Sequence, residues 1–86
     1  MASITASFEI LRSDLAIIEL TEDRSGEWRG SFRVDLPTSE HSAIGCASEQ
    51  EWLDSCHARL YDRAYDRAST EAHLHGGYLG RFVRAA

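Results

Sequence analysis

The sequence predicts an α+β fold in which one long helix packs on one face of an antiparallel sheet of three or four strands. Three segments in the first 34 residues have the pattern of strands, and a capping-box signature introduces a long helical stretch after them. A single proline, 43% hydrophobic residues and 27% charged residues fit one folded domain over residues 1–86. The element order is therefore βββα, or βββαβ if the end of the chain adds a strand.

The three predicted strands cover residues 4–11, 15–20 and 27–34. In the first, apolar residues alternate with polar ones, which is typical of a strand that is buried on one side. The second is short and mostly apolar, as expected of a central strand. The turn between the second and third strands ends at Gly26, a residue that tolerates a positive φ. One face of the third strand is expected to carry Trp28, Gly30, Phe32 and Val34.

A helix is predicted to follow the aperiodic loop 35–47. Ser48 and Glu51 form a capping box, in which the serine caps the helix and the glutamate reaches back to the serine amide. The helix can continue to about His75, where glycines would end it in a left-handed cap. Its length would be roughly 40 Å, which is more than a small sheet can cover.

Two different faces of this helix carry apolar residues. The face expected to pack on the sheet consists of Trp52, Leu53, Cys56, Leu60 and Ala64. Beyond Ala64 this face is interrupted by charged residues. We therefore expect the helix to bend near residues 69–70, or its second half to extend past the sheet and present a different face. The weakly alternating segment 78–83 is the candidate for a fourth strand.

The second face comes from a tandem repeat of Tyr-Asp-Arg-Ala at residues 61–64 and 65–68. Four residues at helical spacing combine aromatic area with small side chains that permit close approach of another backbone, and they are candidates for partner binding. They are Tyr61, Tyr65, Ala68 and Ala72. The alternative is that the tyrosines pack on the chain's own loop 35–47 or on its C-terminal strand.

Acidic residues outnumber basic ones, and the net charge is −5. Most acids precede residue 59, whereas the last 28 residues carry more arginines than acids, so the domain is electrically polarised. Spaced carboxylates attract arginine and lysine and can imitate a phosphate backbone. The acidic candidates for partner binding are Glu22, Asp23, Glu27, Asp35 and Glu40. The alternative role for such a surface is solubility alone.

The remaining side chains offer little chemistry. We expect Arg59 and Arg63 to form ion pairs with the aspartates three residues later, which argues against a basic stripe for nucleic acid. The cysteines and histidines lack the spacing of zinc ligands, and Cys56 and His57 diverge by about 100° on a helix. No cofactor, metal or catalytic residue is predicted.

These features favour a noncatalytic protein-binding module. The absence of lysine and asparagine indicates a GC-rich coding sequence, as in many bacteria and their phages. We therefore expect a cytoplasmic phage or mobile-element inhibitor, similar in kind to anti-CRISPR proteins, that binds a basic nucleic-acid-handling complex of its host through acidic and aromatic surface. The alternative is a homodimeric regulatory or antitoxin-like protein that associates through its helix.

Overall fold

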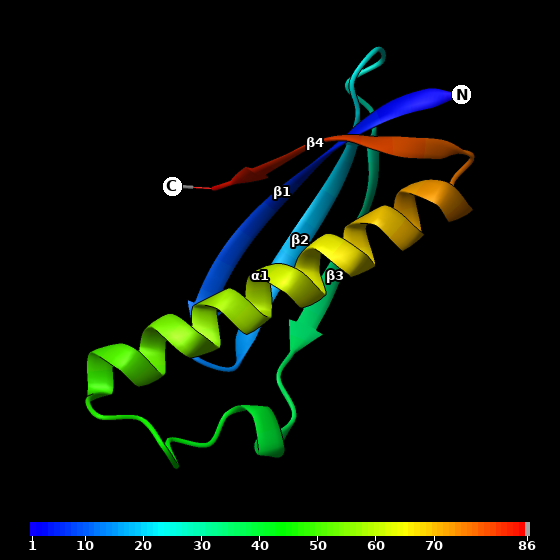
Figure 1. Cartoon of the computed structure of the whole chain (residues 1–86). Coiled ribbons are helices and arrows are strands. Elements are labelled where there is room, and N and C mark those ends of the chain that lie inside the picture. Colours follow the sequence, from blue (N-terminus) through cyan, green and yellow to red (C-terminus); the bar gives the residue numbers. More distant parts are fainter. Residues whose placement is uncertain (86) are drawn as a thin grey trace.

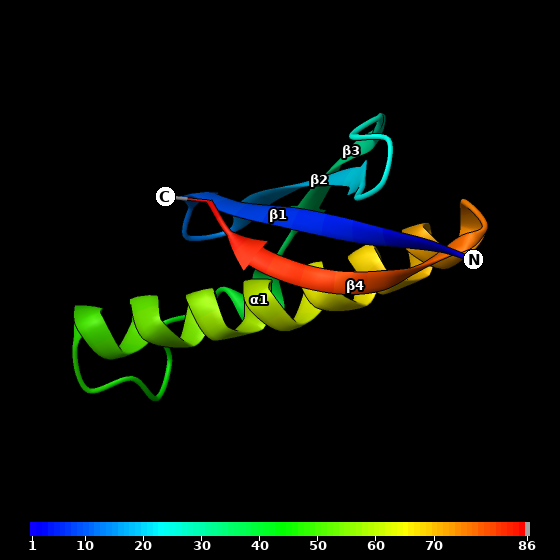
Figure 2. The same ribbon diagram turned by 90° about the horizontal axis from the view of Figure 1, so that it is seen from above.

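The computed structural model describes residues 1–85 and contains a four-stranded sheet with one long helix (Figure 1). In chain order the elements are β1 (Ala2–Arg12), β2 (Leu15–Glu22), β3 (Trp28–Asp35), the short 3-10 helix η1 (Thr38–Glu40), α1 (Glu49–Leu74) and β4 (Gly77–Arg84). Helix α1 lies along one face of the sheet (Figure 2). The predicted α+β fold, with a helix on a single face, is confirmed.

The sheet has the strand order β3-β2-β1-β4 and is mixed rather than wholly antiparallel. The first three strands form the expected antiparallel meander, whereas β4 pairs with β1 in parallel. Strand β3 runs in the same direction as β1, and α1 carries the chain back across the sheet. A strand that follows such a crossover runs parallel to the strand before it. The sequence therefore predicted the fourth strand but not its direction.

One face of the sheet forms the core. Alternate residues of β1 and β2 are buried against α1, and they are Ile4, Ala6, Phe8, Ala16, Ile18 and Leu20. Strand β3 contributes Val34, but Trp28 does not share its face. The ladder shifts register between Leu20 and Thr21, so that Trp28 lies opposite Thr21 on the other face and is exposed. This irregularity corrects the expected alternation at the start of the third strand.

Helix α1 begins and ends close to the predicted residues. The Ser48 side chain accepts a hydrogen bond from the Glu51 amide at 3.1 Å. The Glu51 carboxylate accepts from the Ala47 amide, one residue before the serine amide that the capping box predicts. After the last turn, Gly76 has a φ of 80°, the left-handed conformation predicted for the cap.

The helix is unbroken over 26 residues and does not bend away from the sheet. Its buried residues lie four apart along the whole element, and they are Cys56, Leu60, Ala64, Ala68 and Ala72. A row of this spacing winds slowly around a helix, and a twisted sheet can follow it because its strands rotate in step. The second half of α1 therefore packs on the sheet through alanines, and it is the first half that extends beyond the strands (Figures 1 and 2).

The extended first half of α1 is held by the loop that precedes it. The Trp52 indole N–H donates to the His41 carbonyl oxygen at 2.8 Å, and the two rings lie 5.1 Å apart. Arg59 and Arg63 of α1 both bond to Glu40, the first to its carbonyl and the second to its carboxylate. These contacts fasten the loop to the helix over about three turns.

Candidate protein-binding site

The four predicted helical residues divide between the core and the surface. Ala68 and Ala72 are fully buried against the sheet in the single chain, so neither is open to a partner. Tyr61 and Tyr65 are each 45% exposed. The small alanine side chains thus allow α1 to pack closely on the chain's own sheet. The candidate surface on α1 consists of the tyrosines and their exposed neighbours.

The two tyrosines stand over Phe82 of β4. Their rings meet the Phe82 ring edge-on, with centroids 5.1 Å away for Tyr61 and 5.4 Å away for Tyr65. Phe82 in turn stacks on the buried Phe8 at 5.6 Å. This is one of the two arrangements that the sequence left open, packing on the C-terminal strand. The inner ring edges are fixed by aromatic contacts, while the rest of each tyrosine stays open to solvent.

Two aspartates complete this surface, which we call the Tyr-Asp face: Tyr61, Asp62, Tyr65 and Asp66. The four residues line a shallow depression of about 470 Å³ on the exposed side of α1. The expected ion pairs of Asp62 and Asp66 with arginines three residues earlier are absent from residues 1–85. Arg59 and Arg63 bond instead to Glu40.

The Tyr-Asp face has the chemistry to bind a cation. A guanidinium or ammonium group over a tyrosine ring gains about 0.5–1 kcal/mol at an exposed site, and a neighbouring carboxylate adds a charge-assisted hydrogen bond. Because both residue types repeat at a spacing of four, the face offers two such positions one helical turn apart. Neither aspartate was among the predicted site residues, since the sequence pattern assigned both to ion pairs within the helix.

The five acidic residues predicted to bind a partner do not form one surface. Three of them, Glu22, Asp23 and Glu27, lie in or beside the turn between β2 and β3. Of the other two, Asp35 is the last residue of β3, roughly 24 Å from its first residue along the strand, and Glu40 lies beyond it in η1. Four of the five are engaged within the chain. Glu22 pairs with Arg29, Asp35 with Arg33, and Glu40 with Arg63, while Asp23 accepts hydrogen bonds from two hydroxyl groups.

Asp23 fastens the β2–β3 turn to β1. Its carboxylate accepts from the hydroxyl groups of Thr5 and of Ser3, the latter at 2.7 Å, and its amide donates to the Ser3 carbonyl at 3.0 Å. The hydrogen bonds from Thr5 and Ser3 lower the pKa of this carboxyl below 3.8, and the positive charge of Arg81 adds to this effect. The Asp23 carboxylate therefore serves to hold the fold together more than to form an interface.

We expect Asp23→Asn to lower the thermal midpoint by a few degrees at neutral pH. The folded pKa of Asp23 lies below the unfolded value, so its ionised form stabilises the fold above pH 3.8 and loses this effect as the pH falls through the folded pKa. The difference between the two midpoints should therefore shrink below pH 3.8. Thermal unfolding followed by circular dichroism between pH 2.5 and 7 checks this. The control Asp62→Asn should leave the midpoint nearly unchanged, and an equal drop in both variants would contradict the assignment.

The sulfur and imidazole groups lie apart. Burial raises the pKa of the Cys56 thiol, which is a core residue, and Cys46 is a second free cysteine in the loop. Within residues 1–85 no group of three or more histidine, cysteine or acidic side chains is placed to hold a metal ion. The described part of the chain also has no helix long and apolar enough to span a membrane.

Comparison with known proteins identifies no family or relative from which a role could be assigned to these residues. No protein-family model matches the chain, and the searches of curated proteins and of solved structures find no significant similarity.

Proposed function

We propose that the chain is a noncatalytic protein-binding module that holds arginine or lysine side chains of a basic protein partner on its Tyr-Asp face. The observation that carries this proposal is the pairing of two half-exposed tyrosines with two aspartates that have no ion-pair partner within residues 1–85. Aromatic side chains that are fixed on one edge provide contact area at little cost in conformational entropy.

The rest of the proposal concerns the partner. We take it to be a nucleic-acid-handling complex of a bacterial host, inhibited in the cytoplasm by this product of a phage or mobile element in the manner of anti-CRISPR proteins. A net charge of −5 supports a basic partner because it favours encounter with positively charged surfaces. Small size supports the phage or bacterial origin, and so does the absence of lysine and asparagine, which indicates a GC-rich coding sequence.

A titration with short basic peptides tests the binding chemistry. We expect a hexa-arginine peptide to shift the amide resonances of residues 61–66 in an ¹⁵N-labelled chain, with saturation, and a hexa-citrulline peptide of the same shape to leave them in place. Tyr65→Leu or Asp66→Asn should each weaken binding roughly three- to ten-fold, since each removes one cation contact. Glu27→Gln removes an equal charge from the β2–β3 turn and serves as the matched control.

Two results would refute this assignment. One is saturable binding of citrulline with the same affinity as arginine, because the charge would then be irrelevant. The other is a peptide footprint centred on Glu27 or Asp35, which would place recognition on a different acidic surface.

A pull-down from a CRISPR-bearing bacterium, with and without nuclease, then tests the partner class. Recovery of a basic nucleic-acid-binding protein after nuclease treatment is the expected result.

The second candidate, a homodimer paired through α1, is tested by one substitution. Ala68 and Ala72 face the core, so of the four predicted residues only Tyr61 and Tyr65 are open to helix pairing. A dimer that Tyr65→Asp dissociates would favour this regulatory or antitoxin-like role over binding of a basic partner.

A further inference from the structure

The open edge of β3 differs from the open edge of β4. Strand β4 carries a register shift between Leu79 and Arg81, where Gly80 is the extra residue, and such a bulge interrupts pairing with a further strand. From Gly30 to Asp35, β3 keeps an unbroken register with β2. A regular edge with unpaired backbone groups is a template for another strand.

The backbone groups at this edge can be assigned from the ladder. The Leu36 amide donates to the Asp14 carbonyl oxygen at 2.9 Å, at the end of the β2–β3 pairing. In an antiparallel pair, hydrogen-bonded residues alternate with residues whose N–H and C=O groups point away from the partner. The even-numbered residues of this part of β3 therefore bond to β2. Ser31, Arg33 and Asp35 direct their amides and carbonyls to the open side.

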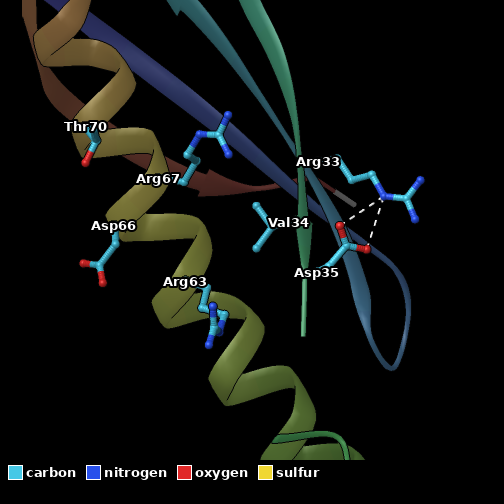
Figure 3. Close-up of a pocket in the computed structure, with 7 residues that line it drawn as sticks. All are labelled: Arg33, Val34, Asp35, Arg63, Asp66, Arg67 and Thr70. Atoms are coloured by element: carbon cyan, nitrogen blue, oxygen red, sulfur yellow. Dashed lines mark hydrogen bonds and ion pairs between the residues drawn. The ribbon is translucent and has the colours of Figure 1, made fainter. Parts of the chain in front are cut away.

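The side chains along the same edge are self-complementary. Arg33 and Asp35 project on the face opposite α1, 64% and 55% exposed, with the Arg33 Nε 3.2 Å from the Asp35 carboxylate (Figure 3). On the helix side the edge carries the apolar residues Phe32, Val34 and Leu36, of which Phe32 is only half-buried. Opposite charges thus lie on one face and apolar groups on the other.

We propose that two copies of this chain pair through antiparallel β3 strands about a two-fold axis at Val34. This register places Arg33 opposite the partner's Asp35 and Asp35 opposite the partner's Arg33, so that the four charges alternate in sign. It also brings the backbone groups of these residues into about four hydrogen bonds. Centring the axis on Arg33 instead would place two arginines opposite each other, which disfavours that register.

The groove between β3 and α1 is compatible with a second strand. It has a volume of about 500 Å³, and Val34 and Arg67 extend into it from opposite sides while Asp66 points away (Figure 3). The Arg67 Cζ lies 4.9 Å from the centroid of the Phe32 ring, so the guanidinium group covers the apolar side of the edge at this point. In the proposed dimer the partner's Leu36 lies beside Phe32, and the two valines meet at the axis. The eight strands then form one continuous sheet with both helices on the same face.

Charge reversal tests this register. We expect the wild type to sediment as a concentration-dependent dimer, and Arg33→Asp or Asp35→Arg to raise the dimer dissociation constant at least about a hundred-fold, since each sets like charges opposite each other. The double variant Arg33→Asp/Asp35→Arg restores opposite signs and should return to within about three-fold of wild type. Both side chains are more than half exposed, so thermal midpoints should stay within a few degrees.

Two controls separate this interface from other surfaces. Glu19→Arg changes the charge by the same amount on β2, and Tyr65→Asp alters the Tyr-Asp face; both should remain dimeric. A wild type that stays monomeric at about 1 mM overturns the proposal. So does a dimer that survives the single reversals at β3. Because the Tyr-Asp face is not part of this interface, failure here leaves the peptide-binding result unaffected.

Discussion

Phe8→Ala is expected to lower the free energy of unfolding by about 3–5 kcal/mol. Phe8 is 1% exposed and lies at the centre of the aromatic cluster, stacked on Phe82 at 5.6 Å and edge-on to Tyr61 at 5.9 Å. Truncation leaves a cavity, and neither Phe82 nor Tyr61 can fill it without moving from its own position. A chain of this length has a total stability of roughly 4–13 kcal/mol, so the variant should approach the unfolding threshold at 37 °C.

Urea unfolding followed by tryptophan fluorescence measures this change, provided that wild type and variant share one m-value. Tyr65→Ala is the matched control, because it removes another ring that contacts Phe82 but is 45% exposed. Its thermal midpoint should stay within a few degrees of wild type. Equal losses in both variants would mean that the Tyr-Asp face is as much a part of the core as Phe8, and would weaken its assignment to partner binding.

Local sequence signals predicted most of the element boundaries. Alternation in β1, the apolar run in β2 and the turn at Gly26 lead directly to the meander. Ser48 and Gly76 mark the two ends of α1, because caps satisfy backbone groups that only the adjacent residues can reach. Such signals are local, so they can be recognised without knowledge of the tertiary fold.

The failures of prediction have long-range causes. The face of Trp28 depends on a register shift against β2, which no pattern within β3 reveals. The burial of Ala68 and Ala72 depends on sheet twist, since a helical wheel assumes a straight line of contact. Asp62 and Asp66 lack their expected arginine partners because Glu40, from a loop distant in sequence, bonds to Arg59 and Arg63.

The two proposed surfaces lie on opposite sides of α1. The tyrosines contact Phe82 of β4, whereas Arg67 covers Phe32 of β3, and β4 and β3 are the two outer strands of the sheet. A dimer formed through β3 therefore leaves both Tyr-Asp faces open at its ends. Two weak cation sites per face would then act together on a basic partner with several accessible arginines, which raises the overall affinity without any new contact.

Ala68→Leu is expected to destabilise the fold by about 1–3 kcal/mol, although leucine is as good a helix former as most residues. Ala68 is fully buried where α1 approaches the sheet, and three additional carbon atoms there must displace the helix or the strands. If the small residues of this row instead served a partner, the larger side chain would reduce association and leave stability intact.

Ala58→Leu provides the comparison, because Ala58 lies on the exposed side of the same helix. The substitution is chemically identical and should change the free energy of unfolding by less than about 0.5 kcal/mol. Thermal unfolding of both variants, together with sedimentation of each, separates packing from association. A stable Ala68→Leu chain would show that the helix does not depend on close approach to the sheet at this point, and the row of alanines would again be open to interpretation as an interface.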